Sequence, residues 1–176
     1  MQSIPRRSSG FTLLELMFTI LLAAIILGFA VPNFRSMAAS SRLRTQTNDF
    51  TTAFNFARSS AISRNAPVTF CRVDAATDDT CAANEGLWQN WIVRTPAEVI
   101  RRGAINSTST LRVDSTLTND RLVFGTDGLT RDSSGVVVTA GTITVCSTVL
   151  PADNTRLITL GSGSRVSVDK STGTCS

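Results

Sequence analysis

An apolar run with a single charge occupies residues 11–31, near the start of the chain. Its length matches the roughly 20 residues that an α-helix needs to cross a bilayer. The one charged residue is Glu15, and a charge inside hydrocarbon costs about 2.5 to 3.5 kcal/mol on insertion scales. The pattern therefore predicts a membrane-spanning helix whose carboxylate needs a partner.

A second hydrophobic pattern, with a helical period, follows Pro32. Proline lacks an N–H and its ring clashes with the preceding turn, so we expect a kink there before the helix continues over residues 32–65. One apolar stripe comprises Leu43, Phe50, Phe54, Ala57 and Ala61, and the opposite face carries Arg42, Arg44, Asn48, Asn55 and Ser59. The stripe favours packing against a sheet over insertion into a partner's groove. Asn65-Ala66-Pro67 predicts the helix end.

Beyond Pro67 the period shortens to that of β-strands. The strand-like segments are 68–73, 87–93, 111–113, 121–124, 136–138, 142–145, 156–160 and 165–168. Turn-forming pairs such as Asp127-Gly128 and Ser134-Gly135 separate them. The expected fold class is α+β: a long N-terminal helix followed by an antiparallel, β-sandwich-like globular domain over residues 66–176.

Composition argues against several kinds of catalytic site. The 176 residues suffice for one soluble domain plus the N-terminal helix. The chain has no histidine, which is the usual general base of nucleophile systems and the commonest transition-metal ligand. Gly161-Ser-Gly163 lacks the third glycine of a dinucleotide fingerprint and reads as a turn. We therefore expect no enzyme, no catalytic residue, no metal and no cofactor.

The four cysteines are too widely spaced for a CxxC redox or zinc pattern. An exported domain lies in an oxidising compartment, where an even number of cysteines indicates disulfides. Three pairings are possible in principle. We favour Cys71–Cys81, which closes a short loop, together with Cys146–Cys175, which pins the C-terminal segment.

Two further groups of residues allow a functional and a structural interpretation. Asp74, Asp78 and Asp79 lie between two cysteines, and clustered carboxylates suit Ca²⁺, but their spacing does not match an EF-hand loop. A solvated hairpin loop is the favoured interpretation. Trp88 and Trp91 could form a ligand platform, but we expect them to be packing residues.

The charge distribution predicts the orientation in the membrane. Arg6 and Arg7 contribute two of the formal net charges of +4, which leaves about +2 for the rest of the chain. The positive-inside rule predicts that these arginines face the cytoplasm. Everything after Pro32 is then expected outside the inner membrane, in the periplasm.

The junction between these arginines and the apolar run has a distinctive order. Gly10-Phe11-Thr-Leu-Leu-Glu15 resembles the class III leader of type IV prepilins and type II secretion pseudopilins. An ordinary secretory signal has its cleavage site after a core of about 7–15 apolar residues, and a plain single-pass anchor gives Glu15 no role. The resemblance implies that prepilin peptidase cleaves after Gly10 and methylates Phe11.

This resemblance also implies a domain order and a mode of assembly. Residues 1–10 are the leader, 11–31 the transmembrane and filament-core segment, and 32–65 the amphipathic continuation. The amine of a cleaved Phe11 would meet Glu15 of a neighbouring subunit, and such a pair is far stronger in a low dielectric than in water. Pilin-like proteins similarly carry a proline near Pro32.

Other segments extend the resemblance to most of the chain. The helix end at 56–65, Val68-Thr-Phe-Cys71, Gly86-Leu-Trp88-x-x-Trp91 and Phe124-Gly125-Thr-Asp-Gly128 resemble the GspH/FimT group of minor pseudopilins and minor pilins. This implies a structural subunit at or near the tip of a type IV pilus that primes assembly for twitching motility and adhesion. The implied partners are other minor and major pilins or pseudopilins, prepilin peptidase, the inner-membrane assembly platform and, before assembly, membrane lipid.

Two alternatives stay open within this group. One is a GspH-like minor pseudopilin of type II protein secretion. The other is a FimT-like DNA-binding pilin of natural transformation, which uses a C-terminal Gly-Arg-x-Arg motif. Here Ser164-Arg165-Val166-Ser167 keeps only Arg165, although Arg156 could add charge from a neighbouring strand. So few phosphate contacts predict weak, salt-sensitive binding.

Overall fold

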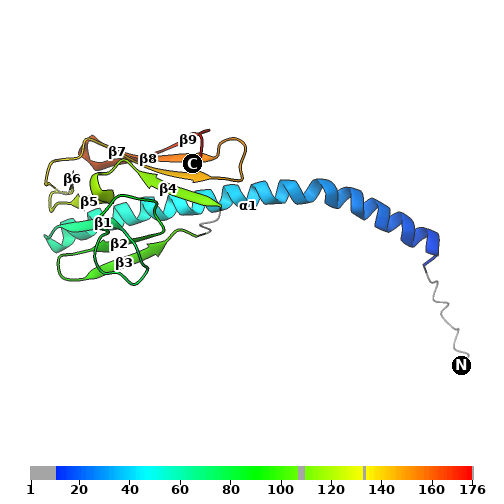
Figure 1. Ribbon diagram of the computed structural model, residues 1–176, viewed down its shortest axis with the longest axis horizontal. Coiled ribbons are helices and arrows are strands. Elements are labelled where there is room, and N and C mark those ends of the chain that lie inside the picture. The colour runs from blue at the N-terminus through cyan, green and yellow to red at the C-terminus, as the bar shows by residue number, and fades with distance from the viewer. Residues whose placement is uncertain (1–10, 107–109, 133, 176) are drawn as a thin grey trace, which may run out of the picture. The chain divides into compact units, whose positions relative to one another are not determined.

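The computed structural model describes residues 11–106, 110–132 and 134–175 (Figure 1). The expected cleavage residue, Gly10, lies outside these ranges. The chain divides into two compact units, one that ends at Met37 and one that comprises Ala38–Ser176. A single helix, α1 (Leu13–Arg64), contributes to both units.

The strands form two antiparallel sheets. The first has the order β3-β2-β1-β5-β6 and the second the order β4-β7-β8-β9. The strands are β1 (Val68–Val73), β2 (Asn90–Arg94), β3 (Val99–Ala104), β4 (Leu111–Ser115), β5 (Arg121–Phe124), β6 (Thr130–Arg131), β7 (Ala140–Ser147), β8 (Thr155–Gly161) and β9 (Arg165–Ser171). Two short 3₁₀ turns, η1 (Thr118–Asp120) and η2 (Ser162–Ser164), precede β5 and β9. The expected α+β class, with a long helix before antiparallel sheets, is confirmed.

Helix α1 ends as the sequence predicts. Asn65 adopts a left-handed conformation with φ 48°. The N–H of Ala66 donates to the carbonyl of Ala61 and that of Asn65 to Ile62, both at 3.3 Å, which is a Schellman cap. At the other expected irregularity, Pro32, the helical assignment continues without interruption. The kink angle there stays a prediction.

The hydrophobic core joins the second half of α1 to both sheets. Every residue of the predicted stripe is buried, and the predicted polar face is exposed. Around Phe50 and Phe54 lie rings from three other parts of the globular unit: Phe70, Trp88, Trp91 and Phe124. The expectation that the stripe and both tryptophans are packing residues is confirmed. Helix residues from Ala38 onward therefore belong to the same compact unit as the strands.

Some of the strand predictions differ from the structure. The expected strand at 136–138 is wrong, because only an isolated bridge joins Val137 to Arg131. Asp132 Oδ1 accepts hydrogen bonds from the N–H of Ser134 and of Val136, which closes a turn in place of a ladder. Strand β2 begins at Asn90, three residues later than predicted. Strands β3 and β6 were not predicted, since β3 is polar and glycine-containing and β6 has only two residues.

Candidate functional site

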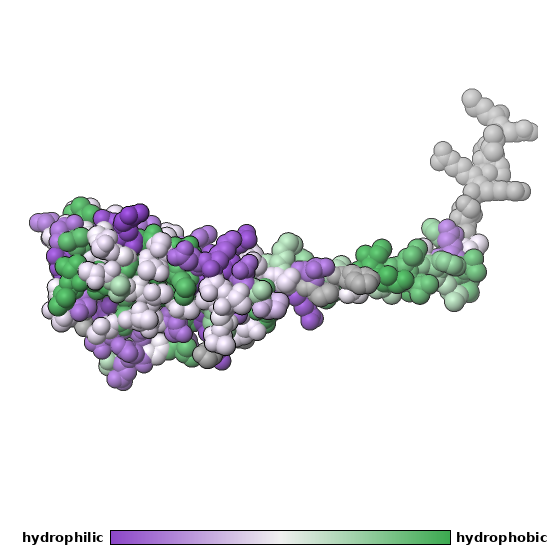
Figure 2. Space-filling model, turned by 90° about the horizontal axis from the view of Figure 1, so that it is seen from above, coloured by the Kyte–Doolittle hydropathy of each residue, from purple (hydrophilic) through white to green (hydrophobic). Residues whose placement is uncertain are grey.

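The first candidate site is the N-terminal half of α1. Among the described residues, α1 is the one helix long and apolar enough to cross a membrane by length and composition. The large apolar side chains that the structure describes between Leu13 and Val31 are exposed, and Figure 2 shows hydrophobic residues gathered along this segment. A soluble monomer rarely exposes so much contiguous apolar surface, so this segment requires a lipid or protein environment.

Glu15 occupies a defined position at the start of this helix. Thr12 precedes the first helical residue, and its Oγ1 accepts a hydrogen bond from the N–H of Glu15 at 3.2 Å. The Thr12 carbonyl accepts from the N–H of Leu16, also at 3.2 Å. This contact is one half of a capping box, whose sequence signature Thr-x-x-Glu is present here. Glu15 thus lies in the first turn, where the helix dipole favours a negative charge. Phe11 lies just before the cap and is 81% exposed.

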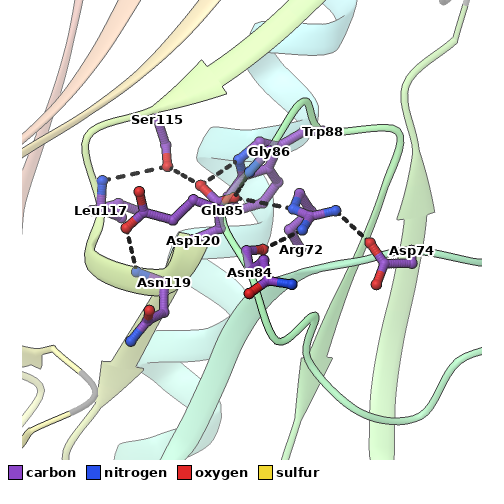
Figure 3. Close-up of polar contacts among 10 residues, drawn as sticks. All are labelled: Arg72, Asp74, Asn84, Glu85, Gly86, Trp88, Ser115, Leu117, Asn119 and Asp120. Carbon is purple, nitrogen blue, oxygen red and sulfur yellow. Dashed lines mark hydrogen bonds and ion pairs between the residues drawn. The ribbon is translucent and has the colours of Figure 1, made fainter.

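The second candidate site is a network of polar contacts around the buried carboxylate of Asp120, which the sequence analysis did not identify (Figure 3). Its Oδ2 accepts from Arg72 Nε at 3.0 Å and from the Gly86 N–H at 2.8 Å. Its Oδ1 accepts from Trp88 Nε1 at 3.1 Å and from Ser115 Oγ at 2.6 Å. Four donors from three parts of the chain, which are β1, the segment at 84–88 and β4, therefore converge on one carboxylate.

The guanidinium of Arg72 is also fully engaged. It forms an ion pair with exposed Asp74 at 2.6 Å and donates to the carbonyl of Asn84. Glu85 closes the same segment by accepting from the N–H of Asn119 at 2.9 Å. Because both oxygens of Asp120 are occupied, this carboxylate cannot act as a general base. The network instead fastens the segment at 84–88 to β1, β4 and η1.

The cysteines form two disulfides, Cys71–Cys81 and Cys146–Cys175. The first closes the acidic loop, whose carboxylates have separate partners. Asp78 Oδ2 accepts from the N–H of Ala75 at 2.8 Å, and Asp79 forms an ion pair with Arg102. No three potential metal ligands gather within the described ranges. The carboxylates diverge toward protein donors, so the loop's geometry does not favour the calcium alternative.

The two arginines considered for DNA do not lie together. Arg156 and Arg165 are on neighbouring strands, as expected, but Arg165 pairs with Gly161, five residues beyond Arg156 on β8. At about 3.3 Å per residue the separation along the hairpin is about 17 Å. Arg165 is exposed, whereas Arg156 is buried and lies beside Arg44 of α1 and Lys170 of β9. The single basic patch that a DNA receptor would need from these two residues is absent.

Comparisons with known proteins agree with this architecture. Residues 46–172 match the family model described as type II transport protein GspH, and residues 5–31 match the prokaryotic N-terminal methylation motif. Curated protein sequences give no significant match.

Two solved structures, both of the type IV minor pilin FimU of Pseudomonas aeruginosa in different crystal forms, are similar in fold at 15% sequence identity. The alignment with one of them covers 82% of this chain and 97% of the FimU chain, with a TM-score of 0.51. The alignment with the other covers 80% of this chain and 99% of the FimU chain, with a TM-score of 0.50. Because the GspH model spans most of the chain and the methylation motif covers its start, the chain belongs to the GspH family of pilin-like proteins.

Proposed function

We propose that this chain is a minor pilin that enters a type IV pilus at or near its tip and primes assembly, without enzymatic activity. The observation that carries the proposal is the exposed apolar half of α1, with one carboxylate in its first turn. Such a segment suits two successive environments, lipid before assembly and neighbouring helices afterwards.

The assembly step follows from the position of Glu15. Cleavage after Gly10 by a prepilin peptidase would leave a charged, methylated amine on Phe11, one helical turn before the carboxylate. In a filament, the amine of one subunit would pair with Glu15 of the next, which sets the register between adjacent helices. An unpaired Glu15 is unfavourable in the bilayer, so the pairing also draws the subunit out of the membrane toward the filament.

A second candidate function, a minor pseudopilin of type II protein secretion, is supported by the description of the matching family model. Both functions would use an inner-membrane anchor, a periplasmic domain and the assembly platform of the machine concerned. They differ in the machine served. Deletion of the gene should abolish surface pili and twitching in the first case, and should abolish release of secreted enzymes while pili remain in the second.

Glu15→Ala tests the assembly mechanism directly. The variant should insert and be processed at Phe11, because removal of the charge makes the membrane anchor more favourable. Its incorporation into sheared filaments should fall about tenfold or more, given the kcal/mol scale of an intramembrane charge. Glu98→Ala, which removes an exposed carboxylate paired with Arg64, is the matched control and should incorporate normally. Normal incorporation of Glu15→Ala would contradict the mechanism.

A further inference from the structure

A groove lies between α1 and the hairpin of β8 and β9, elements that Figure 1 shows together in the globular part of the chain. It is lined by Arg44, Thr47, Asn48, Arg156, Val168 and Lys170 and has a volume of about 250 Å³. Three of the six lining residues are cationic, and none is acidic. We call it the cationic groove.

The cations of the groove are held close together by the strand register. Arg156 on β8 pairs directly with Lys170 on β9, so the two side chains emerge on the same face of the hairpin. Directly opposed like charges destabilise a sheet. Arg44 approaches from α1 as a third positive charge. The fold therefore tolerates a repulsive arrangement at this place.

Arg156 is the anchor of the cluster. It is only 4% exposed, and its Nη1 donates to the carbonyls of Asp153 and Thr155, both at 2.8 Å. These carbonyls fix the guanidinium but carry no net charge. A buried charge without an opposite charge is costly, and removing one partner of a buried ion pair typically costs several kcal/mol for that reason.

No carboxylate of the described chain neutralises the cluster. The five ion pairs formed within the described residues involve neither Arg44, Arg156 nor Lys170. Asp169 is adjacent to Lys170 in the strand and therefore points to the opposite face of the sheet. Asp49 of α1 does not line the groove. The missing negative charge must come from another molecule or from solvent ions.

We propose that the cationic groove is a docking site for an Asp or Glu side chain of a neighbouring filament subunit. This inference rests on the proposed function, because one wall of the groove is α1, the helix through which the subunits would pack. A recessed guanidinium with a second cation opposite suits one carboxylate, which an arginine fork binds in bidentate fashion. Duplex DNA would need a row of exposed cations, whereas here Arg156 is recessed and Arg165 lies at the far end of the hairpin.

Carbodiimide cross-linking tests the docking site, because Lys170 is the only lysine in the chain. The reagent couples an amine to a carboxylate that it contacts. In assembled filaments, mass spectrometry should find Lys170 joined to an Asp or Glu of another subunit. Lys170→Arg keeps the charge without a reactive amine, so it should incorporate normally and lose this cross-link.

Charge reversal separates docking from a structural role. Lys170→Glu places a carboxylate opposite Arg156, so it should raise the Tm of the detergent-solubilised full-length chain while lowering incorporation into filaments about tenfold. Arg165→Glu makes the same charge change on the same strand, away from the groove, and should leave incorporation unchanged.

The outcomes that would overturn the inference are distinct. Filaments that contain the subunit but show no intermolecular cross-link at Lys170 refute the docking site alone. Normal incorporation of Lys170→Glu, combined with loss of binding to a 20-bp DNA duplex, would identify the groove as a nucleic-acid site instead. If the wild-type subunit is missing from filaments, the proposed function fails and the docking site fails with it.

Discussion

Asp120 and Asp74 contact the same guanidinium, Arg72, from environments that differ sharply in exposure. The side chain of Asp120 is 3% exposed and that of Asp74 is 70% exposed. Water screens the outer pair and solvates its members if the contact breaks, so such pairs contribute little. Water cannot solvate the members of the inner pair if that contact breaks, because both side chains are buried.

Asp120→Asn should therefore destabilise the globular unit strongly. In either orientation the amide nitrogen faces a donor from which it cannot accept, Arg72 and the Gly86 N–H on one side or Trp88 Nε1 on the other. The guanidinium of Arg72 also loses its buried counter-charge and keeps only the exposed Asp74. The expected loss is about 3–5 kcal/mol in the free energy of unfolding. Asp74→Asn, the matched control, should cost about 1 kcal/mol or less. Urea unfolding of both variants measures the difference, and equal losses would show that burial does not govern this network.

Gly103 illustrates a glycine whose role is packing. It lies opposite Trp91 in the β2–β3 ladder, and an added Cβ would collide with the indole ring. Arg101 lies over the same ring at 5.7 Å from its centroid. The single glycine of β3, which weakened its strand signal in the sequence, thus leaves the space that the indole ring of Trp91 occupies.

At the scale of elements, the turn after β5 packs against the end of α1. Gly125 and Gly128 close this turn, with the N–H of Gly128 donating to the Gly125 carbonyl at 2.9 Å. Gly128 has φ 74°, and a Cβ there would lie 3.0 Å from Ile62 Cδ1 and 3.2 Å from Arg58 Nε. Both conformation and proximity therefore favour glycine.

Gly128→Ala should cost about 1–2 kcal/mol for the left-handed backbone, and more for the displaced helix side chains. Gly135→Ala is the matched control, since Gly135 has φ 88° but nothing within 4 Å of an added Cβ. The excess loss in Gly128→Ala, measured by thermal unfolding, reports the contact with α1. If both variants lose the same stability, the contact between the turn and α1 does not contribute to the cost.

Two carboxylates in and after this turn make the stability of the protein depend on pH. The hydrogen bond from Arg131 holds the pKa of Asp127 well below its usual range, and the Ser134 hydroxyl lowers the pKa of Asp132. A carboxyl with a depressed folded pKa contributes stability above its unfolded pKa of about 3.9, and loses that contribution as the pH falls toward the folded pKa.

We therefore expect the Tm of the wild-type chain to fall more steeply below about pH 4 than that of Asp127→Asn/Asp132→Asn. The effect should be modest because both carboxyls are at the surface. Thermal unfolding between pH 6 and pH 2 provides the comparison. Parallel pH profiles for the two proteins would contradict the assignment.

At the scale of the whole molecule, the distribution of basic residues weighs against a DNA receptor. The cations near the C-terminal hairpin are split between the recessed groove and Arg165, about 17 Å apart along the strands. We expect the full-length chain to bind duplex DNA only in the non-specific range, about 10⁻⁴ to 10⁻⁶ M at physiological salt. Arg156→Ala/Arg165→Ala should change this little in a gel-shift titration at two salt concentrations. Tight wild-type binding that the double variant loses would make DNA uptake the leading function.

The sequence by itself determined the features that depend on neighbouring residues. The stripe from Leu43 to Ala61, the cap at Asn65 and the limits of β1 and β5 follow from periodicity and turn chemistry, which act over a few residues. The apolar run and the N-terminal methylation motif could likewise be identified from the sequence, because each is a contiguous segment. The two disulfides in the structure join the cysteines that loop length favoured.

Only the tertiary structure decided which distant residues meet. Arg72 and Asp120 are 48 residues apart, and nothing local marks either as buried. Val136 to Val138 have strong strand propensity, yet among the described residues they pair only through an isolated bridge from Val137 to Arg131. Arg44, Arg156 and Lys170 gather into one groove from three separate elements. The physical reason is that burial and charge pairing depend on the register of the sheets and their packing on α1, which no short stretch of sequence encodes.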